Sequence, residues 1–266
     1  MELNNESKTL FIPLLGKAQM SKEKIFLNDP KAEEIIGKVD YDVKSLKQSK
    51  WLSMYMSMRA LIFDELCNQY ISEHPNATII HLGCGLDSRC IRVQQTFQTW
   101  YDVDYENVIA IRKQFYETDT QHQMIGSSVT DYQWLDHIES FSDGNVLVVA
   151  EGLTMYLSEE EVKELISQLH KKFGAVHLLF DAYSKKGVKA SKIKNPVNQM
   201  DAEVKYGLDT PEEFLSLNDH LEYIATHLIK KDDNTLHGST KFIFNKLYCG
   251  KISQSIYKIY EFKLKK

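Results

Sequence analysis

A short glycine-containing segment, residues 81–88 (His-Leu-Gly-Cys-Gly-Leu-Asp-Ser), is a candidate ligand-binding loop. It follows a β-branched apolar run and precedes a helical pattern. A strand that enters a helix through G-x-G lets the backbone approach a nucleotide-like ligand. The pyrophosphate fingerprint needs a third glycine, but position 88 is serine. The segment therefore favours a nucleotide-like ligand without a pyrophosphate, although the same glycines also fit a tight turn that binds nothing.

Acidic residues lie at the end of the next predicted strand, at Asp102 and Asp104. Asp104 lies about 20 residues beyond Gly83, the spacing at which a carboxylate accepts hydrogen bonds from the hydroxyls of a ribose. A solvated strand end or a helix N-cap would also explain Asp104, because a helical pattern begins directly after it. The spacing favours the ribose.

A further acid, Glu151, is followed by Gly152 and comes directly after residues 145–150, a continuously apolar run. In an open parallel sheet, ligands bind beyond the carboxyl ends of the strands, and this acid would lie there with the glycine loop and Asp104. A solvated loop carboxylate would explain Glu151 taken alone. A glycine loop and a ribose-binding acid are common to sites for NAD and for S-adenosylmethionine (SAM). Without a third glycine or a phosphate-binding lysine or arginine at the loop, SAM fits better, and nearby acids would suit its sulfonium cation.

The elements that must position these residues alternate between strands and helices. Strands are predicted at Ala77–His81, Thr99–Val103, Met124–Gly126, Asn145–Ala150, Ala175–Phe180, Leu221–Ile229 and Ser255–Leu264. Helices are predicted at Gln48–His74, Ser88–Phe97, Tyr105–Thr118 and Asp131–Ile138, after a capping box at Ser158–Glu161, and after Thr210-Pro211.

This alternation predicts βαβ units, and hence a parallel sheet with helices on both faces. We expect a single domain over residues 1–266. It would contain an N-terminal helical region (1–74), a ligand-binding core (75–182), an irregular, lysine-rich insertion (183–219) and closing strands (220–266).

Composition excludes several other classes of protein. The chain has 266 residues, 43% of them hydrophobic, with 32 basic against 37 acidic residues and a net charge of −5. It is therefore neither disordered nor suited to broad neutralisation of nucleic-acid phosphates. No run is long enough to span a membrane, and no secretory signal is visible. The four cysteines lack zinc spacing, so we expect no metal, and reduced thiols in the cytoplasm.

Several segments, in order along the chain, resemble the leucine carboxyl methyltransferase family, which also contains tetracenomycin-type polyketide O-methyltransferases. The resemblance implies a class I methyltransferase fold, a Rossmann-like sheet of seven strands with the last antiparallel, and SAM as methyl donor. The matching segments are Asn28–Ala32, Val39–Asp42, Arg59–Asp64, Leu82–Arg89, Asp102–Asp104, Ala150–Leu157 and the closing Tyr257–Phe262.

The resemblance also implies roles for individual residues. Arg59 would bind the methionine carboxylate of SAM, Asp104 the ribose, and Glu151 would lie near the amino group. The rest of the expected cofactor set is Gly83, Cys84, Gly85, Asp87, Ser128 and Val129. Two positions depart from the family pattern: Cys84 replaces a commoner alanine, and Ser128-Val129 replaces Asp-Leu, so that Asp131 is a candidate for the missing acid beside the adenine.

The resulting hypothesis is a SAM-dependent O-methyltransferase that acts by positioning, with a small molecule or a peptide terminus as acceptor. A carboxylate acceptor would need no base, because it is already ionised at neutral pH. Tyr156 and Asp181 are weaker catalytic candidates, the second as a base for a hydroxyl acceptor. We expect no nucleic-acid or membrane partner, and the oligomeric state is left open. The alternatives are an NAD-dependent oxidoreductase and a non-catalytic relative that binds SAM.

Overall fold

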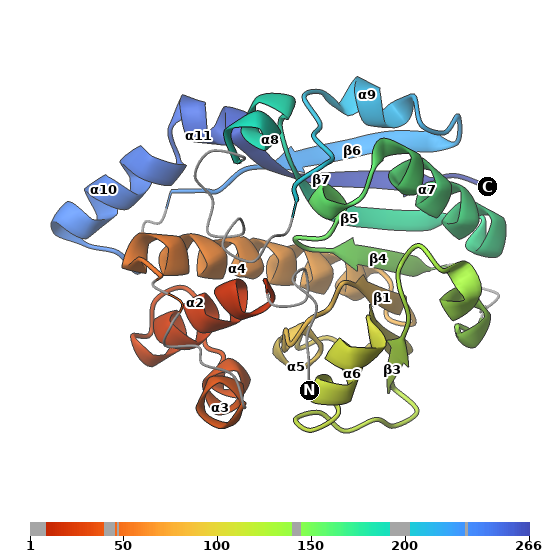
Figure 1. Ribbon diagram of the computed structural model, residues 1–266, viewed down its shortest axis with the longest axis horizontal. Helices are drawn as coiled ribbons and strands as arrows, with labels where there is room; N and C mark the ends of the chain where they lie inside the picture. The colour runs from red at the N-terminus through yellow and green to blue at the C-terminus, as the bar shows by residue number, and fades with distance from the viewer. Residues whose placement is uncertain (1–8, 40–45, 47, 140–144, 192–202, 232–233) are drawn as a thin grey trace.

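Seven strands form one sheet, with the order β3-β2-β1-β4-β5-β7-β6 (Figure 1). The computed structural model describes residues 9–39, 46, 48–139, 145–191, 203–231 and 234–266. The strands numbered one to five run parallel, and the seventh is antiparallel to both of its neighbours. The predicted fold class is therefore confirmed. The strands are β1 (Thr78–Leu82), β2 (Thr99–Asp104), β3 (His122–Gly126), β4 (Val146–Ala150), β5 (Val176–Tyr183), β6 (Leu221–His227) and β7 (Tyr257–Leu264).

The order of the strands reverses between β1 and β4. The chain runs from β1 outward through β2 to β3, and then returns to pair β4 with the other side of β1. Ligand crevices form at such a reversal, beyond the carboxyl ends of the strands. Gly83 follows β1, Asp104 ends β2 and Glu151 follows β4, so the topology brings all three to one edge of the sheet.

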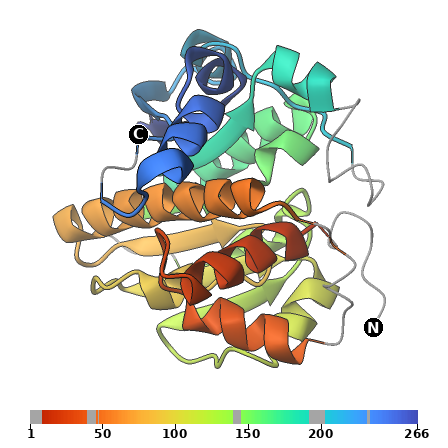
Figure 2. The same ribbon diagram turned by 90° about the vertical axis from the view of Figure 1, so that its left-hand side faces the viewer.

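One face of the sheet is covered by the long helix α4 (Lys50–Glu73), which begins at a Ser49 cap. Met58, Ile62 and Phe63 of this helix share a buried cluster with Ile79 and Leu147 of the central strands. Helix α2 (Phe11–Lys22) packs on α4, and α3 (Pro30–Lys38) packs on α2, so α4 lies between this pair and the helices near the C-terminus (Figure 2).

The opposite face carries the alternate residues of the same strands, such as Ile80 and Val148. They pack with Leu165 of α7 (Glu159–Phe173) and Trp134 of the 3₁₀ helix η2 (Tyr132–His137). The capping box that starts α7 is confirmed, because the Ser158 hydroxyl accepts from the Glu161 backbone N–H at 3.2 Å and the Glu161 carboxylate accepts from the Ser158 N–H at 2.7 Å.

The helices after β1 and β2 are shorter than the sequence predicts. Helix α5 comprises only Arg89–Arg92, and the backbone N–H of Gln94 donates to the side chain of Asn68, outside the helix. Helix α6 comprises Glu106–Arg112 and ends in irregular turns that bring the Tyr116 hydroxyl to the Leu86 carbonyl. After α5 the contact to Asn68, and after α6 the contact to Leu86, takes the place of a further helical turn.

Helices absent from the sequence prediction lie around the closing strands. Helix α8 (Lys185–Ser191) falls in the stretch expected to be irregular, before α9 (Pro211–Leu215). Helices α10 (Gly238–Tyr248) and α11 (Lys251–Ile256) connect β6 to β7, so β7 starts two residues later than predicted. The predicted cap residue Thr210 stands at the N-cap of α9, but its side chain makes no capping bond. Lys192, Lys194 and Pro196 of the lysine-rich stretch lie outside the described residues.

In the part of the chain that the structure describes, no helix combines the length and the apolar character needed to cross a bilayer.

Candidate active site

A cavity of about 540 Å³ lies where the carboxyl ends of β1, β2 and β4 face α2, α4 and α8. This volume is typical of a small-molecule site. The cavity brings together all of the cofactor-binding residues predicted from the sequence, because each is among its lining residues. They are Arg59, Gly83, Cys84, Gly85, Asp87, Asp104, Ser128, Val129 and Glu151.

The glycine loop needs its glycines for backbone conformation. Gly83 and Gly85 have φ values of +62° and +51°, a region that side chains disfavour. A Cβ atom at Gly83 would also lie 3.1 Å from the side chain of Leu153. The chain therefore turns sharply after β1 and presents backbone, rather than side chains, to the cavity.

Asp104 connects β2 to this loop. Its carboxylate accepts hydrogen bonds from the backbone N–H groups of Gly85 and Tyr105, each at 2.7 Å. Burial raises the pKa of Asp104 to about 6, although both N–H donors oppose the shift. Both a turn-stabilising role and a ribose-binding role are compatible with this geometry, because the side chain also lines the cavity.

Arg59 and Glu151 form an ion pair within the cavity wall. The Arg59 Nε and Nη2 atoms lie 2.7 and 2.6 Å from Glu151 Oε1, and Arg89 donates to the other carboxylate oxygen. Burial alone would raise the pKa of Glu151, but the two guanidinium groups outweigh it and hold this pKa at about 2. Sequence reasoning missed Arg89, although it closes the loop segment that carries the family resemblance.

Asp87 belongs to a buried network of charges. Its carboxylate oxygens lie 2.9 Å from Lys17 Nζ, 2.8 Å from Arg92 Nη1 and 3.3 Å from Arg89 Nη2. Asp64 accepts from both arginines in turn. The network ties α2, α4 and α5 to the glycine loop, so Asp87 has a structural role in addition to lining the cavity.

The end of the cavity beyond β3 is lined by small and apolar groups. The Ser128 hydroxyl lies 2.9 Å from that of Thr130, and Val129 is buried. Asp131, the candidate substitute for a missing acid, is exposed at the start of η2 and does not line the cavity. We therefore no longer expect it to contact an adenine.

Comparison with known proteins identifies the family of the chain. The family model "Leucine carboxyl methyltransferase" matches residues 13–170. The tetracenomycin polyketide synthesis O-methyltransferase TcmP of Streptomyces glaucescens is 31% identical over 219 residues, covering 81% of this chain and 80% of TcmP. The chain belongs to the leucine carboxyl methyltransferase family.

This family membership confirms the predicted class of enzyme, a SAM-dependent O-methyltransferase. The SAM-dependent methyltransferase dpfgK of Gibberella zeae is 29% identical over 186 residues, 64% of this chain and 62% of that protein. The alternative of an NAD-dependent oxidoreductase is not supported.

Solved structures agree with the fold. A duf574 family protein from Streptomyces avermitilis superposes with a TM-score of 0.62 at 11% identity, covering 91% of this chain and 98% of that one. Magnesium protoporphyrin IX methyltransferase from Synechocystis PCC 6803, solved with bound SAM, has a TM-score of 0.52 at 11% identity, with 94% and 97% covered.

Tyrosines line the other end of this methyltransferase cavity. Tyr55, Tyr156, Tyr183, Tyr248 and Tyr257 all contribute to its wall. Burial raises the pKa of Tyr156 to about 12 and that of Tyr257 well above its ordinary value. At neutral pH these hydroxyls are therefore protonated donors rather than bases.

Asp181 does not reach the surface of the cavity. It is fully buried, accepts from the Gly152 N–H at 2.8 Å and from the Tyr257 hydroxyl, and lies 3.7 Å from Arg59 Nε. Burial raises its pKa. Because Tyr257 covers it, Asp181 is not placed to take a proton from an acceptor directly, and we withdraw it as a direct base.

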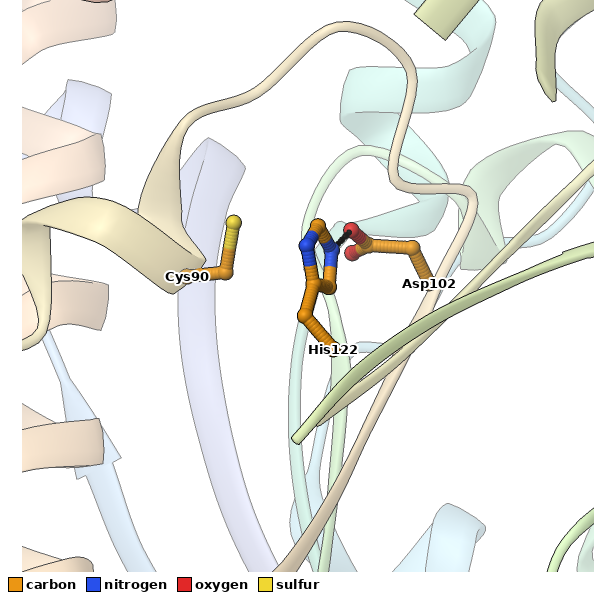
Figure 3. A group of neighbouring side chains, drawn as sticks. All are labelled: Cys90, Asp102 and His122. Atoms are coloured by element: carbon orange, nitrogen blue, oxygen red, sulfur yellow. Dashed lines mark hydrogen bonds and ion pairs between the residues drawn. The ribbon is translucent and has the colours of Figure 1, made fainter. Parts of the chain in front are cut away.

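A separate cluster of Cys90, Asp102 and His122 has ligand atoms close enough to suggest a metal (Figure 3). Asp102 is already bonded, however, to His122 Nε2 at 2.5 Å and to Arg112 Nη2 at 2.5 Å, and Arg112 also donates to the Cys90 sulfur at 3.7 Å. The guanidinium group of Arg112 thus already supplies a positive charge to Asp102 and contacts Cys90. Arg112 donates further to the carbonyls of Gly85 and Asp87, so we assign the cluster to support of the glycine loop.

Proposed function

We propose that the chain methylates a carboxylate oxygen of a small-molecule acceptor or a peptide terminus. The observation that carries this proposal is that Asp181, the candidate base beside the tyrosines, lies behind Tyr257 and does not line the cavity. A carboxylic acid has a reference pKa near 4 and arrives ionised, whereas a phenol, with a pKa of about 10, must lose a proton. An ionised carboxylate accepts hydrogen bonds and needs no base, so it suits a site lined by protonated tyrosines.

The described residues fit SAM as the cofactor. Backbone at Gly83 and Gly85 offers a close approach without side chains, Asp104 offers a carboxylate for the ribose, and Arg59 with Glu151 offers opposite charges for the amino-acid part. When bound, SAM supplies an electrophilic methyl group on a sulfonium. In the overall transfer a carbon–sulfur bond breaks and a carbon–oxygen bond forms, the sulfur keeps the electron pair, and a carboxylate acceptor releases no proton.

The contribution of the protein is then to orient the acceptor oxygen and exclude water. Tyrosine hydroxyls other than that of Tyr257, whose proton goes to Asp181, would donate hydrogen bonds to the acceptor, and Gly187, Ala190 and Ser191 of α8 line the same cavity. We propose that residues 183–219 govern the choice of acceptor, since α8 and Lys205 line this end while the cofactor-binding residues all come earlier in the chain. A cytoplasmic location stays a prediction.

A pH–rate profile tests the base-free mechanism. With saturating SAM and a carboxylate acceptor such as 4-methoxybenzoate, the rate should be nearly level from pH 7 to about 9, because no group needs to lose a proton. Asp181→Asn should leave this shape unchanged, and so should Tyr257→Phe, which removes the hydroxyl through which Asp181 could act. A rate that climbs through neutral pH and is lost in Asp181→Asn would instead indicate a hydroxyl acceptor and a relayed base.

A further inference from the structure

Helices α10 and α11 display apolar side chains to solvent beside the active-site cavity. Phe242 is 69% exposed, Ile252 79% and Leu247 46%. The opposite side of α10 is anchored, because Phe244 is fully buried against Phe26 and Tyr248. Helix α10 therefore has one apolar face that packs on the protein and a second apolar face that is exposed to solvent.

The exposed side chains form the walls of a groove between the two helices. Phe242, Ile243 and Ile252 line it together with Lys246 and Lys251. Leu247, Ser253 and Ile256 line both this groove and the active-site cavity. The groove thus begins where the tyrosine-lined end of the cavity stops, with only these side chains at the boundary. In Figure 1, α11 lies next to α8, which closes that same end.

The charge around the groove is positive, although the chain as a whole has a net charge of −5. Lys246 and Lys251 are the charged residues that line the groove, and residues 234–256 contain no aspartate or glutamate. Two copies that met symmetrically through this surface would bring like charges together, which is unfavourable. An anionic amphipathic molecule would meet no such repulsion.

We propose that the α10–α11 groove binds an apolar tail of the methyl acceptor, whose carboxylate lies in the tyrosine-lined end of the cavity. This inference rests on the proposed function, and it adds that the acceptor is amphipathic and longer than the cavity. The groove offers apolar contact along the tail, and the lysines at its rim attract the anionic acceptor. Leu247 and Ile256 are the side chains over which the tail passes.

A series of 4-alkoxybenzoates, from methoxy to octyloxy, tests the proposal. Binding to the full chain is measured by calorimetry with saturating S-adenosylhomocysteine, and methylation is measured separately with SAM. We expect the Kd to fall about tenfold or more along the series, because burying even two of the added methylene groups changes affinity by that factor. The variant Phe242→Gln/Ile252→Gln should lose most of this gain while binding 4-methoxybenzoate as the wild type does.

The substituted side chains are highly exposed, so the variant should fold. Ile224→Gln on β6, where the side chain is 44% exposed, is the matched control and should keep the chain-length gain. Equal methylation of all chain lengths, or a gain that survives in the groove variant, would overturn the groove while leaving the carboxylate mechanism intact. Groove-dependent binding of octyloxybenzoate without methylation of any member would support the groove and reject the proposed acceptor chemistry. A wild-type dimer that Phe242→Gln/Ile252→Gln dissociates, with no change along the series, would assign the surface to a second copy and overturn the proposal.

Discussion

Asp104 should make the affinity for SAM depend on pH. Its pKa of about 6 is raised by burial, and ribose hydroxyls donate hydrogen bonds to the ionised form. The contribution to binding is therefore present above pH 6 and lost as the pH falls. At pH 5, about one tenth of Asp104 is ionised, so we expect the Kd for SAM to be about tenfold higher than at pH 7.5, equivalent to about 1.4 kcal/mol.

Two other charged groups of the site keep their charge over this pH range. Glu151 has a pKa of about 2 and stays ionised between pH 5 and 7.5. His122 is partly buried, but its bond to Asp102 raises its pKa to about 10, so it stays charged. Burial raises the pKa of Asp181 and lowers that of His81, which also lines the cavity. Comparing the wild type with Asp104→Asn separates the contribution of Asp104 from theirs.

Asp104→Asn should weaken SAM binding at pH 7.5 by about 2–3 kcal/mol, the loss of a charged hydrogen-bond acceptor, and should abolish the pH dependence. Isothermal titration calorimetry at constant ionic strength measures both. Asp131→Asn is the control, because that residue is exposed outside the cavity and should leave the Kd at its wild-type value. A wild-type Kd that does not change between pH 5 and 7.5, or a pH dependence that persists in Asp104→Asn, would refute the ribose assignment.

Three further changes have expected outcomes. Arg59→Ala should raise the Kd for SAM by about tenfold or more, and should affect methylthioadenosine less, because that compound lacks the carboxylate that a guanidinium would bind; equal losses in calorimetry would argue against this role. Replacing Lys185, Lys186 and Lys189 with alanine should leave the Kd for SAM unchanged and alter acceptor kinetics, whereas a large loss of SAM binding would contradict the role proposed for residues 183–219. Ser158→Ala should lower the free energy of unfolding by about 1 kcal/mol in urea titration, through loss of the α7 cap, with Ser158→Thr retaining most of it.

The central strands could be predicted from the sequence because their surroundings impose a simple pattern. Every residue of β1 and β4 is buried, and β4 is continuously apolar, while β1 is apolar except at Thr78 and His81. Once the sheet is parallel, residues that follow its strands must gather at one edge. This is why the predicted cofactor residues line one cavity although they are far apart in the chain.

The helices around the closing strands were missed for a physical reason. Helix α10 is apolar on two sides, with Phe244 packed inward and Phe242, Ile243 and Leu247 exposed. Aromatic and β-branched residues on both sides hide the period that identifies an amphipathic helix. The feature that concealed α10 in the sequence is also the one that makes its outer surface a candidate for binding.

Partnerships between charged side chains were not predictable, because they depend on packing between distant segments. Asp181 is separated from the cavity by Tyr257, which the antiparallel pairing of β7 places opposite Tyr183, the last residue of β5. Arg59 meets Glu151 because α4 crosses the sheet at the end of β4. Both acids look alike in the sequence, at the ends of neighbouring strands, and only their partners distinguish a buried acid from one that lines the site.

The ion pair between Arg59 and Glu151 does not prevent binding of the amino-acid part of SAM. Its two charges suit such a ligand. An α-amino acid carries an ammonium and a carboxylate on one carbon, so it presents two opposite charges a short distance apart. The Arg59–Glu151 pair presents the complementary charges, and Arg89 keeps Glu151 in place from the other side. Since these charges are already desolvated and oriented by their mutual contact, little reorganisation would be needed to bind the methionine part of SAM. The same pair would offer no such match to the uncharged ribose or adenine, which is why we propose that this part of the cavity binds the amino acid.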